Sequence, residues 1–150
     1  NIHMKRYITI IILGILPIFY TGCSKDTESF TTYPSPDWSV KSPEQLPNSF
    51  TAIVAVPDEI NVYATDTDKM AAFIGDECRG VGTLVKSDDN QKRVYYLTIR
   101  ASDTDNGEIV FKYYNARLSY MYQATQTVSF VTDGTYGTYD SPVVLDLKYL

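Results

Sequence analysis

Histidine is almost absent from this sequence. The 150 residues contain one, His3, and it precedes Met4. Because translation normally starts at a methionine, we interpret residues 1–3 as a remnant of an expression vector. The native chain then has no histidine, which excludes Ser-His-Asp and Cys-His catalysis and every metal site ligated by histidine.

Basic residues are also few. Thirteen Lys and Arg stand against eighteen Asp and Glu, for a formal net charge of −5. Nucleic-acid binders carry a basic patch or stripe, so we expect no binding to nucleic acid. Asp76 and Glu77 are adjacent on a predicted turn, where their side chains diverge, whereas a glycosidase holds its two carboxylates across a cleft. We therefore expect no enzyme activity and no cofactor.

Long hydrophobic runs are missing, since a spanning helix needs about 20 apolar residues. The apolar stretch Ile8–Phe19 has 12 residues, is broken by Pro17 and follows Lys5 and Arg6, an order typical of a signal peptide. It ends at Tyr20–Cys23. A small residue directly before a cysteine resembles the lipobox of bacterial lipoproteins, in which the cysteine is diacylated and becomes the mature amino terminus. The alternative is an ordinary signal peptide, residues 1–22, followed by an incidental cysteine.

The lipobox resemblance implies lipidation of Cys23 and attachment to the outer membrane. The acidic segment 24–28 resembles the surface-export signal of Bacteroidota lipoproteins, which implies exposure at the cell surface; the alternative is the solvated start of a tether. Cys78 is the only other cysteine. With Cys23 lipidated, we expect no intramolecular disulfide, and we expect Cys78 to act as a small buried hydrophobic side chain.

Proline marks the segment after the lipid cysteine. Residues 23–49 hold four of the seven prolines and show no apolar periodicity, which predicts an extended, lipid-anchored tether. Trp38 is the exception in this segment. Its ring either packs back on the following domain or contacts a partner, and we favour packing.

Short runs of alternating apolar residues fill residues 50–150 and predict one all-β domain. Arg93–Ala101 is the clearest strand, with Tyr95, Leu97 and Ile99 on one face. We expect an antiparallel β-sandwich of about eight short strands, immunoglobulin- or fibronectin-like or jelly-roll-like. Further strands are predicted at 50–56, 60–64, 70–74, 78–86, 108–115, 120–123, 127–131 and 143–147, with a turn at 87–91 and a hairpin connection at 102–107.

One predicted hairpin carries a sequence motif, Ala71–Gly80, which reads Ala-Ala-Phe-Ile-Gly-Asp-Glu-Cys-Arg-Gly. Together with Phe111–Ala116 and Pro142–Leu145, it resembles the small β-sandwich modules of Bacteroidota surface and secreted proteins. The likeness spans about residues 50–147. It implies a β-sandwich and a binding or accessory role, and it brings no catalytic residues. Such modules are mostly parts of large adhesins and hydrolases, whereas here one stands alone on a tether, which suggests that it is itself the functional unit.

The hairpin also has a physical interpretation. Gly75 supplies the positive φ that a tight turn requires. Gly80 and Gly82 suggest a bulge or a close approach of two backbones. We interpret Arg79 first as a structural residue that pairs with Asp76 or with an acidic residue of a neighbouring strand; the alternative is a clamp for a ligand.

Tyrosine is the compositional outlier, with 13 residues. An aromatic ring with a polar tip suits the stacking of sugars and the docking of peptides, but cross-strand packing also favours tyrosine. We expect the strand tyrosines to pack, and we place the ligand site on the glycine-rich loop with Tyr136 and Tyr139 as its anchors. The lower-ranked candidates are Arg79, Tyr114 and Tyr122.

Acidic side chains in two loops are weak candidates for calcium ligands. They are Asp66 and Asp68 in one loop and Asp103, Asp105 and Asn106 in the other. Ordinary turn chemistry also explains them, so we expect no metal.

The sequence therefore predicts a surface-exposed outer-membrane lipoprotein with one β-sandwich module for binding or adhesion, whose ligand is a glycan or a peptide. The alternative is a structural or assembly partner in a larger surface complex, with no small ligand.

Overall fold

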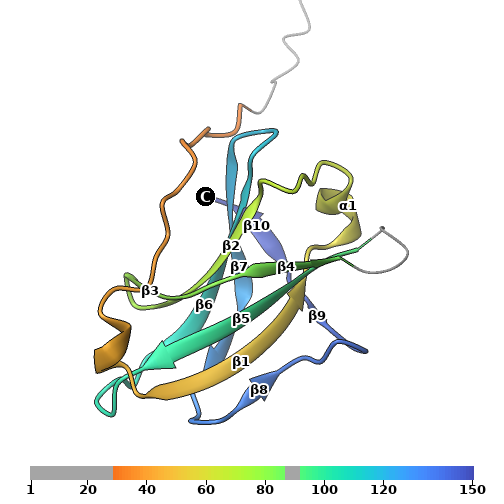
Figure 1. Ribbon diagram of the computed structural model, residues 1–150. Coiled ribbons are helices and arrows are strands. Elements are labelled where there is room, and N and C mark those ends of the chain that lie inside the picture. The colour runs from red at the N-terminus through yellow and green to blue at the C-terminus, as the bar shows by residue number, and fades with distance from the viewer. Residues whose placement is uncertain (1–28, 87–91) are drawn as a thin grey trace, which may run out of the picture.

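The computed structural model describes residues 29–86 and 92–150 and confirms the all-β prediction (Figure 1). Two sheets pack face to face. Sheet A has the order β4-β5-β1-β8, with β9 also paired to β1, and sheet B has the order β10-β7-β6-β2-β3. The strands are β1 (Asn48–Ala55), β2 (Lys69–Ile74), β3 (Glu77–Val81), β4 (Thr83–Lys86), β5 (Arg93–Ala101), β6 (Glu108–Asn115), β7 (Tyr120–Ser129), β8 (Thr135–Tyr136), β9 (Val143–Val144) and β10 (Leu147–Tyr149).

In residues 29–86 and 92–150, helical structure is limited to η1 (Pro43–Gln45) and α1 (Asp58–Asn61). The short helix α1 replaces the strand predicted at 60–64, and that prediction was wrong. Pro57 ends β1 because it lacks the N–H of a ladder, and it precedes Asp58 and Glu59, which favour the first turn of a helix. Within the two described ranges, no helix has the length and apolar content needed to cross a bilayer.

The core lies between the sheets and follows the predicted alternation. In sheet A, Tyr95, Leu97 and Ile99 of β5 point inward and are at most 1% exposed. They meet Phe111 and Tyr113 from sheet B, which are fully buried. At about 25 cal/mol per Å² of apolar surface removed from water, these large side chains dominate the stability of the sandwich.

Two strand segments change sheets at the margins of the sandwich. The chain leaves sheet B after β3 and joins sheet A as β4, passing through Gly82. At the other side it leaves β9 in sheet A and enters β10 in sheet B, with Leu145 N donating to Ala55 O at 3.0 Å.

The connections differ from the sequence predictions in four places. The strand expected at 78–86 is divided between β3 and β4, one in each sheet. Residues 102–107 do not close a hairpin, because β5 belongs to sheet A and β6 to sheet B. The strands expected at 120–123 and 127–131 are one strand, β7. The strand expected at 143–147 is divided between β9 and β10, one in each sheet. The turn predicted at 87–91 lies outside the described residues.

The proline-rich segment is not a loose tether where the structure describes it. Residues 29–47, called the strap here, run along the outer face of sheet B (Figure 1). The hydroxyl of Tyr114 donates to Tyr33 O at 2.9 Å, and Lys69 Nζ donates to Pro36 O at 2.6 Å. Trp38 packs edge-on against Phe73, as predicted, with ring centroids 5.7 Å apart. Scattered aromatic residues, rather than a periodic pattern, attach the strap to the sheet.

Removal of the strap is expected to destabilise the domain. Leu46 is 7% exposed, and full burial of a leucine contributes about 1.5–3 kcal/mol. The free energy of unfolding should therefore be lower by at least about 2 kcal/mol for a chain that begins at residue 48 than for one that begins at residue 29. Urea unfolding under reducing conditions measures the difference, and both chains should melt cooperatively. Equal stabilities would show that the strap adds nothing to the domain.

Candidate functional site

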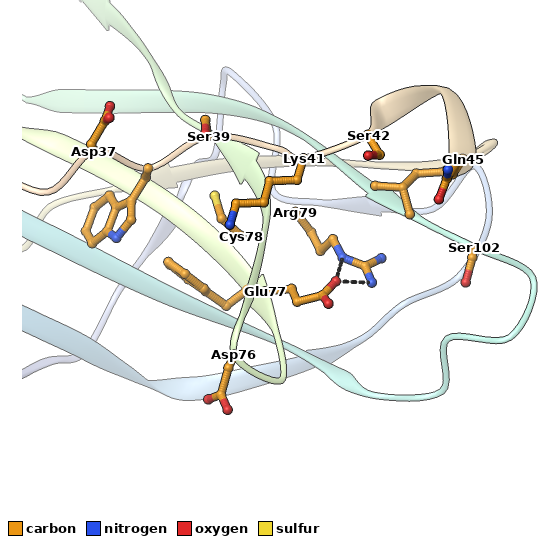
Figure 2. Close-up of a pocket in the computed structure, with 13 residues that line it drawn as sticks. Asp37, Ser39, Lys41, Ser42, Gln45, Asp76, Glu77, Cys78, Arg79 and Ser102 are labelled. Atoms are coloured by element: carbon orange, nitrogen blue, oxygen red, sulfur yellow. Dashed lines mark hydrogen bonds and ion pairs between the residues drawn. The ribbon is translucent and has the colours of Figure 1, made fainter.

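A groove of about 550 Å³ lies between the strap and the β2–β3 hairpin (Figure 2). The strap forms one wall and the motif hairpin forms the other. The lining residues are Asp37, Trp38, Ser39, Lys41, Ser42, Gln45, Leu46, Phe73, Asp76, Glu77, Cys78, Arg79 and Ser102.

The strap wall presents one large aromatic ring among polar side chains. Trp38 is half-buried and packs edge-on against the ring of Phe73. Lys112 also contacts the Phe73 ring, with its Nζ 4.7 Å from the ring centroid. Leu46 closes the end of this wall and is buried. The indole is thus held in place by packing, while part of it remains in contact with solvent.

The hairpin wall is shaped by glycines and a bulge. Gly75 has φ 61° at the turn, and the pairing of β2 with β3 shifts between Ala72 and Phe73, which leaves Arg79 as an extra residue. A Cβ on Gly80 would lie 2.8 Å from Thr98 O, and one on Gly82 would lie 3.0 Å from the Cβ of Met70. Both interpretations from the sequence, the tight turn and the close approach, are confirmed.

Arg79 is a structural residue of the groove floor. It is 8% exposed, and its Nη1 donates to Asp105 Oδ2 at 2.6 Å and to the backbone carbonyl of Arg100 at 3.4 Å. Its Nη2 donates to Glu77 Oε2 at 2.9 Å, drawn as a dashed line in Figure 2. The predicted pairing with an acidic neighbour is thus confirmed, although the partners are Asp105 and Glu77 rather than Asp76. Its donors are already used within the protein.

Acid should weaken this ion pair. The hydrogen bonds from Arg79 and from Ser102 N lower the pKa of Asp105 to about 2, from an ordinary value of 3.8. A carboxyl whose folded-state pKa is depressed stabilises the fold above its unfolded pKa, and this contribution is lost as the pH falls from about 4 towards 2. Asp105→Asn should lower the free energy of unfolding at neutral pH. It should also make that free energy depend less on pH between about pH 4 and pH 2. Urea unfolding of both proteins at several pH values tests this, and parallel curves would contradict it.

The thiol in the groove is not suited to nucleophilic chemistry. Cys78 is half-buried, and burial raises the pKa of its thiol, while its Sγ donates to Gly80 O at 3.7 Å. A nucleophilic cysteine needs a lowered pKa and a neighbouring base, and this side chain has the opposite environment. Cys78 is therefore not assigned a nucleophilic role in the groove.

The predicted ligand residues do not form one site. Tyr122 is 2% exposed and lies in the core, and Tyr114 is 3% exposed beneath the strap. Tyr136 belongs to β8, and its ring is parallel to that of Phe111 at 6.0 Å, so it is constrained by core packing rather than presented by a loop. Tyr139 is 60% exposed and stacks on Tyr96 over the outer face of sheet A. Of the predicted ligand residues, only Arg79 lines the groove.

The weak calcium candidates have other partners. Asp105 is bound to Arg79, and Asp103 Oδ1 accepts a hydrogen bond from Asn48 at 2.8 Å. Asp68 is buried and accepts hydrogen bonds from Thr65 and Ala116. In the part of the chain that the structure describes, no three His, Cys, Asp or Glu side chains gather into a possible metal site.

The strap side of the groove is the part that sequence reasoning missed. Assigning residues 23–49 to a tether removed Trp38, Lys41 and their neighbours from consideration as site residues. The available signal was the spacing of large apolar residues through a proline-rich segment, since Phe30, Tyr33 and Trp38 recur where a tether needs none.

Comparisons with protein-family models, with curated proteins and with solved structures found no match to this chain. The resemblance carried by the hairpin motif therefore remains an interpretation of the sequence. The function has to be argued from the groove and from the fold that builds it.

Proposed function

We propose that the protein is a surface-exposed outer-membrane lipoprotein whose β-sandwich binds a glycan in the groove between the strap and the β2–β3 hairpin. The observation that carries this proposal is the placement of the only tryptophan of the chain in a 550 Å³ groove of otherwise mostly polar lining. Sugar sites combine an aromatic face with side chains that hydrogen-bond hydroxyl groups. Ser39, Ser42 and Gln45 supply such groups along the strap wall of the groove.

The charges of the groove narrow the ligand class. Asp37, Asp76 and Glu77 are acidic, while Lys41 and Arg79 are basic, and Arg79 already pairs with Glu77. An acidic excess repels sulfated and sialylated chains, because like charges brought together in an interface disfavour binding. Neutral glycans or amino sugars are therefore the expected ligands, and no catalytic role is assigned to the groove.

Trp38→Leu tests the site, because leucine keeps an apolar contact with Phe73 and removes the stacking face. A glycan array identifies the tightest neutral oligosaccharide, and calorimetry then measures its affinity. An aromatic contact is worth about 0.5–1.5 kcal/mol, so the affinity should fall by up to about tenfold. Tyr139→Leu is the matched control on the other sheet and should bind normally. If Tyr139→Leu weakens binding and Trp38→Leu does not, the ligand site lies near Tyr136 and Tyr139 instead of in the groove. If the protein captures only peptides, its ligand is a peptide and not a glycan.

The lipid anchor is part of the same proposal, although Cys23 lies outside the described residues. Cys23→Ala should release the protein from the membrane fraction of cells, because the acyl chains are attached through that thiol. If the variant still sediments with membranes at wild-type levels, a lipid on Cys23 does not hold the protein at the membrane.

A protein partner is the second candidate, favoured by the outer face of sheet A. Ile53, Ala55 and Val94 are buried there although they point away from the core, and Val85 and Tyr96 pack around them. Tyr139 extends this apolar surface with a ring parallel to that of Tyr96. If the protein has an assembly role, Tyr139→Ser should abolish complex formation in a crosslinking experiment while Trp38→Leu leaves it intact.

A further inference from the structure

Three aromatic rings gather at the amino-terminal end of the strap. Phe30 stacks on Tyr149 with ring centroids 4.0 Å apart, and it meets Tyr120 edge-on at 5.6 Å. Phe30 is 37% exposed and Tyr149 is 46% exposed. These three residues, called the aromatic pole here, join the strap to β7 and β10.

The strap is fixed at this end of the sandwich. Tyr33 N donates to Ser119 O at 2.8 Å in the β6–β7 turn, and Tyr33 O accepts from Tyr114. Figure 1 shows the strap starting beside that turn and running to η1 at the opposite end, where it forms a wall of the groove. The aromatic pole and the groove therefore occupy opposite ends of the strap.

The proposed anchor lies close to the aromatic pole along the chain. Cys23 precedes Phe30 by seven residues. An extended chain spans at most 3.3–3.6 Å per residue, so these seven steps cover no more than about 25 Å. A lipid on Cys23 would thus hold the pole near the headgroups, whereas a free tether to residue 49 would leave the domain without a fixed orientation.

The charges of the pole suit a lipid surface. The described segments that meet there, residues 29–36, 115–123 and 147–150, contain two charged side chains, Arg117 and Lys148, and both are basic. The acidic segment 24–28 precedes them along the chain and lies outside the described residues. The whole chain has an acidic excess, so this distribution is not that of the average surface. The nearby Asp68 is buried and its oxygens accept hydrogen bonds, and Lys148 also pairs with Asp146. Exposed aromatic rings with basic neighbours are typical of protein surfaces that contact a membrane interface.

We propose that the aromatic pole lies against the lipid headgroups and that the sandwich stands on the bilayer with its groove facing outward. This proposal rests on the lipid anchor of the proposed function and adds an orientation to it. The pole is then a second interaction surface, and its ligand is the headgroup region of the membrane itself.

Tryptophan fluorescence tests the orientation because Trp38 is the only tryptophan. The chain from residue 23, with Cys78→Ser, is coupled through the Cys23 thiol to a maleimide lipid in phosphatidylcholine and phosphatidylglycerol vesicles. The vesicles contain lipid brominated at the top of its acyl chains, which places the quencher directly beneath the headgroups. The anchor is thereby supplied chemically, so the result does not depend on lipidation in cells or on glycan binding. Trp38 should keep its fluorescence. A Tyr149→Trp, Trp38→Phe variant should lose most of its fluorescence.

A Tyr139→Trp, Trp38→Phe variant is the matched control on the side of sheet A and should not be quenched. If the Tyr149 variant does not fold, Phe30→Trp in the same background replaces it. Equal fluorescence with and without brominated lipid at the pole would overturn the proposal, and so would quenching of Trp38. A dimer of the uncoupled chain that Tyr149→Ser dissociates would also overturn it, because the pole would then bind a second copy.

Discussion

Asp68→Ala is expected to lower the free energy of unfolding by about 3–5 kcal/mol, because it removes the acceptor of a buried hydrogen-bond network. Asp68 is 7% exposed. It accepts from Thr65 N at 2.9 Å, from Thr65 Oγ1 at 3.0 Å and from Ala116 N at 2.8 Å, and the Tyr113 hydroxyl also donates to it. Burial, together with this carboxylate, raises the pKa of Tyr113, so its hydroxyl stays a donor. Each buried donor left without a partner costs about 1–3 kcal/mol.

Asp66→Ala provides the control two residues away. Asp66 pairs with Arg93 at 2.6 Å, but its side chain is 59% exposed, and exposed ion pairs contribute about 0–1 kcal/mol. Urea unfolding of the two variants should therefore separate them by at least about 2 kcal/mol. Equal effects would show that the network around Asp68 is no stronger than a surface pair.

Gly137→Ala should be the most damaging glycine substitution. Gly137 has φ 79°, and an added Cβ would lie 2.3 Å from Ile53 O and 3.0 Å from Val143 N. The contacts are backbone atoms of β1 and β9, so relief requires one strand to move away from the other. The left-handed conformation costs a non-glycine residue about 1–2 kcal/mol and overpacking adds about 1–3 kcal/mol, which gives a loss of about 2–5 kcal/mol.

Gly75→Ala separates the two causes. Gly75 also has a positive φ, 61°, but an added Cβ would meet nothing within 4 Å. Its substitution should cost only the conformational part, about 1–2 kcal/mol. Denaturant midpoints of the two variants measure the difference, and a Gly75 variant as unstable as the Gly137 variant would show that backbone strain alone accounts for the loss.

Local features of the fold were predictable where a single residue type decides the geometry. The turn at Gly75 and the inward face of β5 follow directly from conformational freedom and from alternation. The close approach at Gly80 was also predictable, since a side chain there would meet Thr98 O. These signals act over a few residues, so no knowledge of distant partners is needed.

The assignment of strands to sheets was not predictable in the same way. Residues 102–107 have the composition of a hairpin turn, yet they cross from sheet A to sheet B. Alternation shows which residues face the core but not which sheet they belong to, because both sheets share one core. The groove was missed for a related reason. Trp38 and the hairpin meet only after the strap folds across sheet B. A proline-rich segment has no hydrophobic period from which this packing could be predicted.

Strand β1 has consequences for the time course of folding. Its neighbours are β5 on one side and the carboxyl-terminal strands β8 and β9 on the other, with Thr51 opposite both Thr98 and Thr135. Such distant pairings give slow folding, on the order of milliseconds to seconds, because long loops must close before the contacts form. The central strand cannot be completed until the last part of the chain is present. We therefore expect the emerging chain to stay unfolded during synthesis, which is the condition that the export step of the proposed lipoprotein would require.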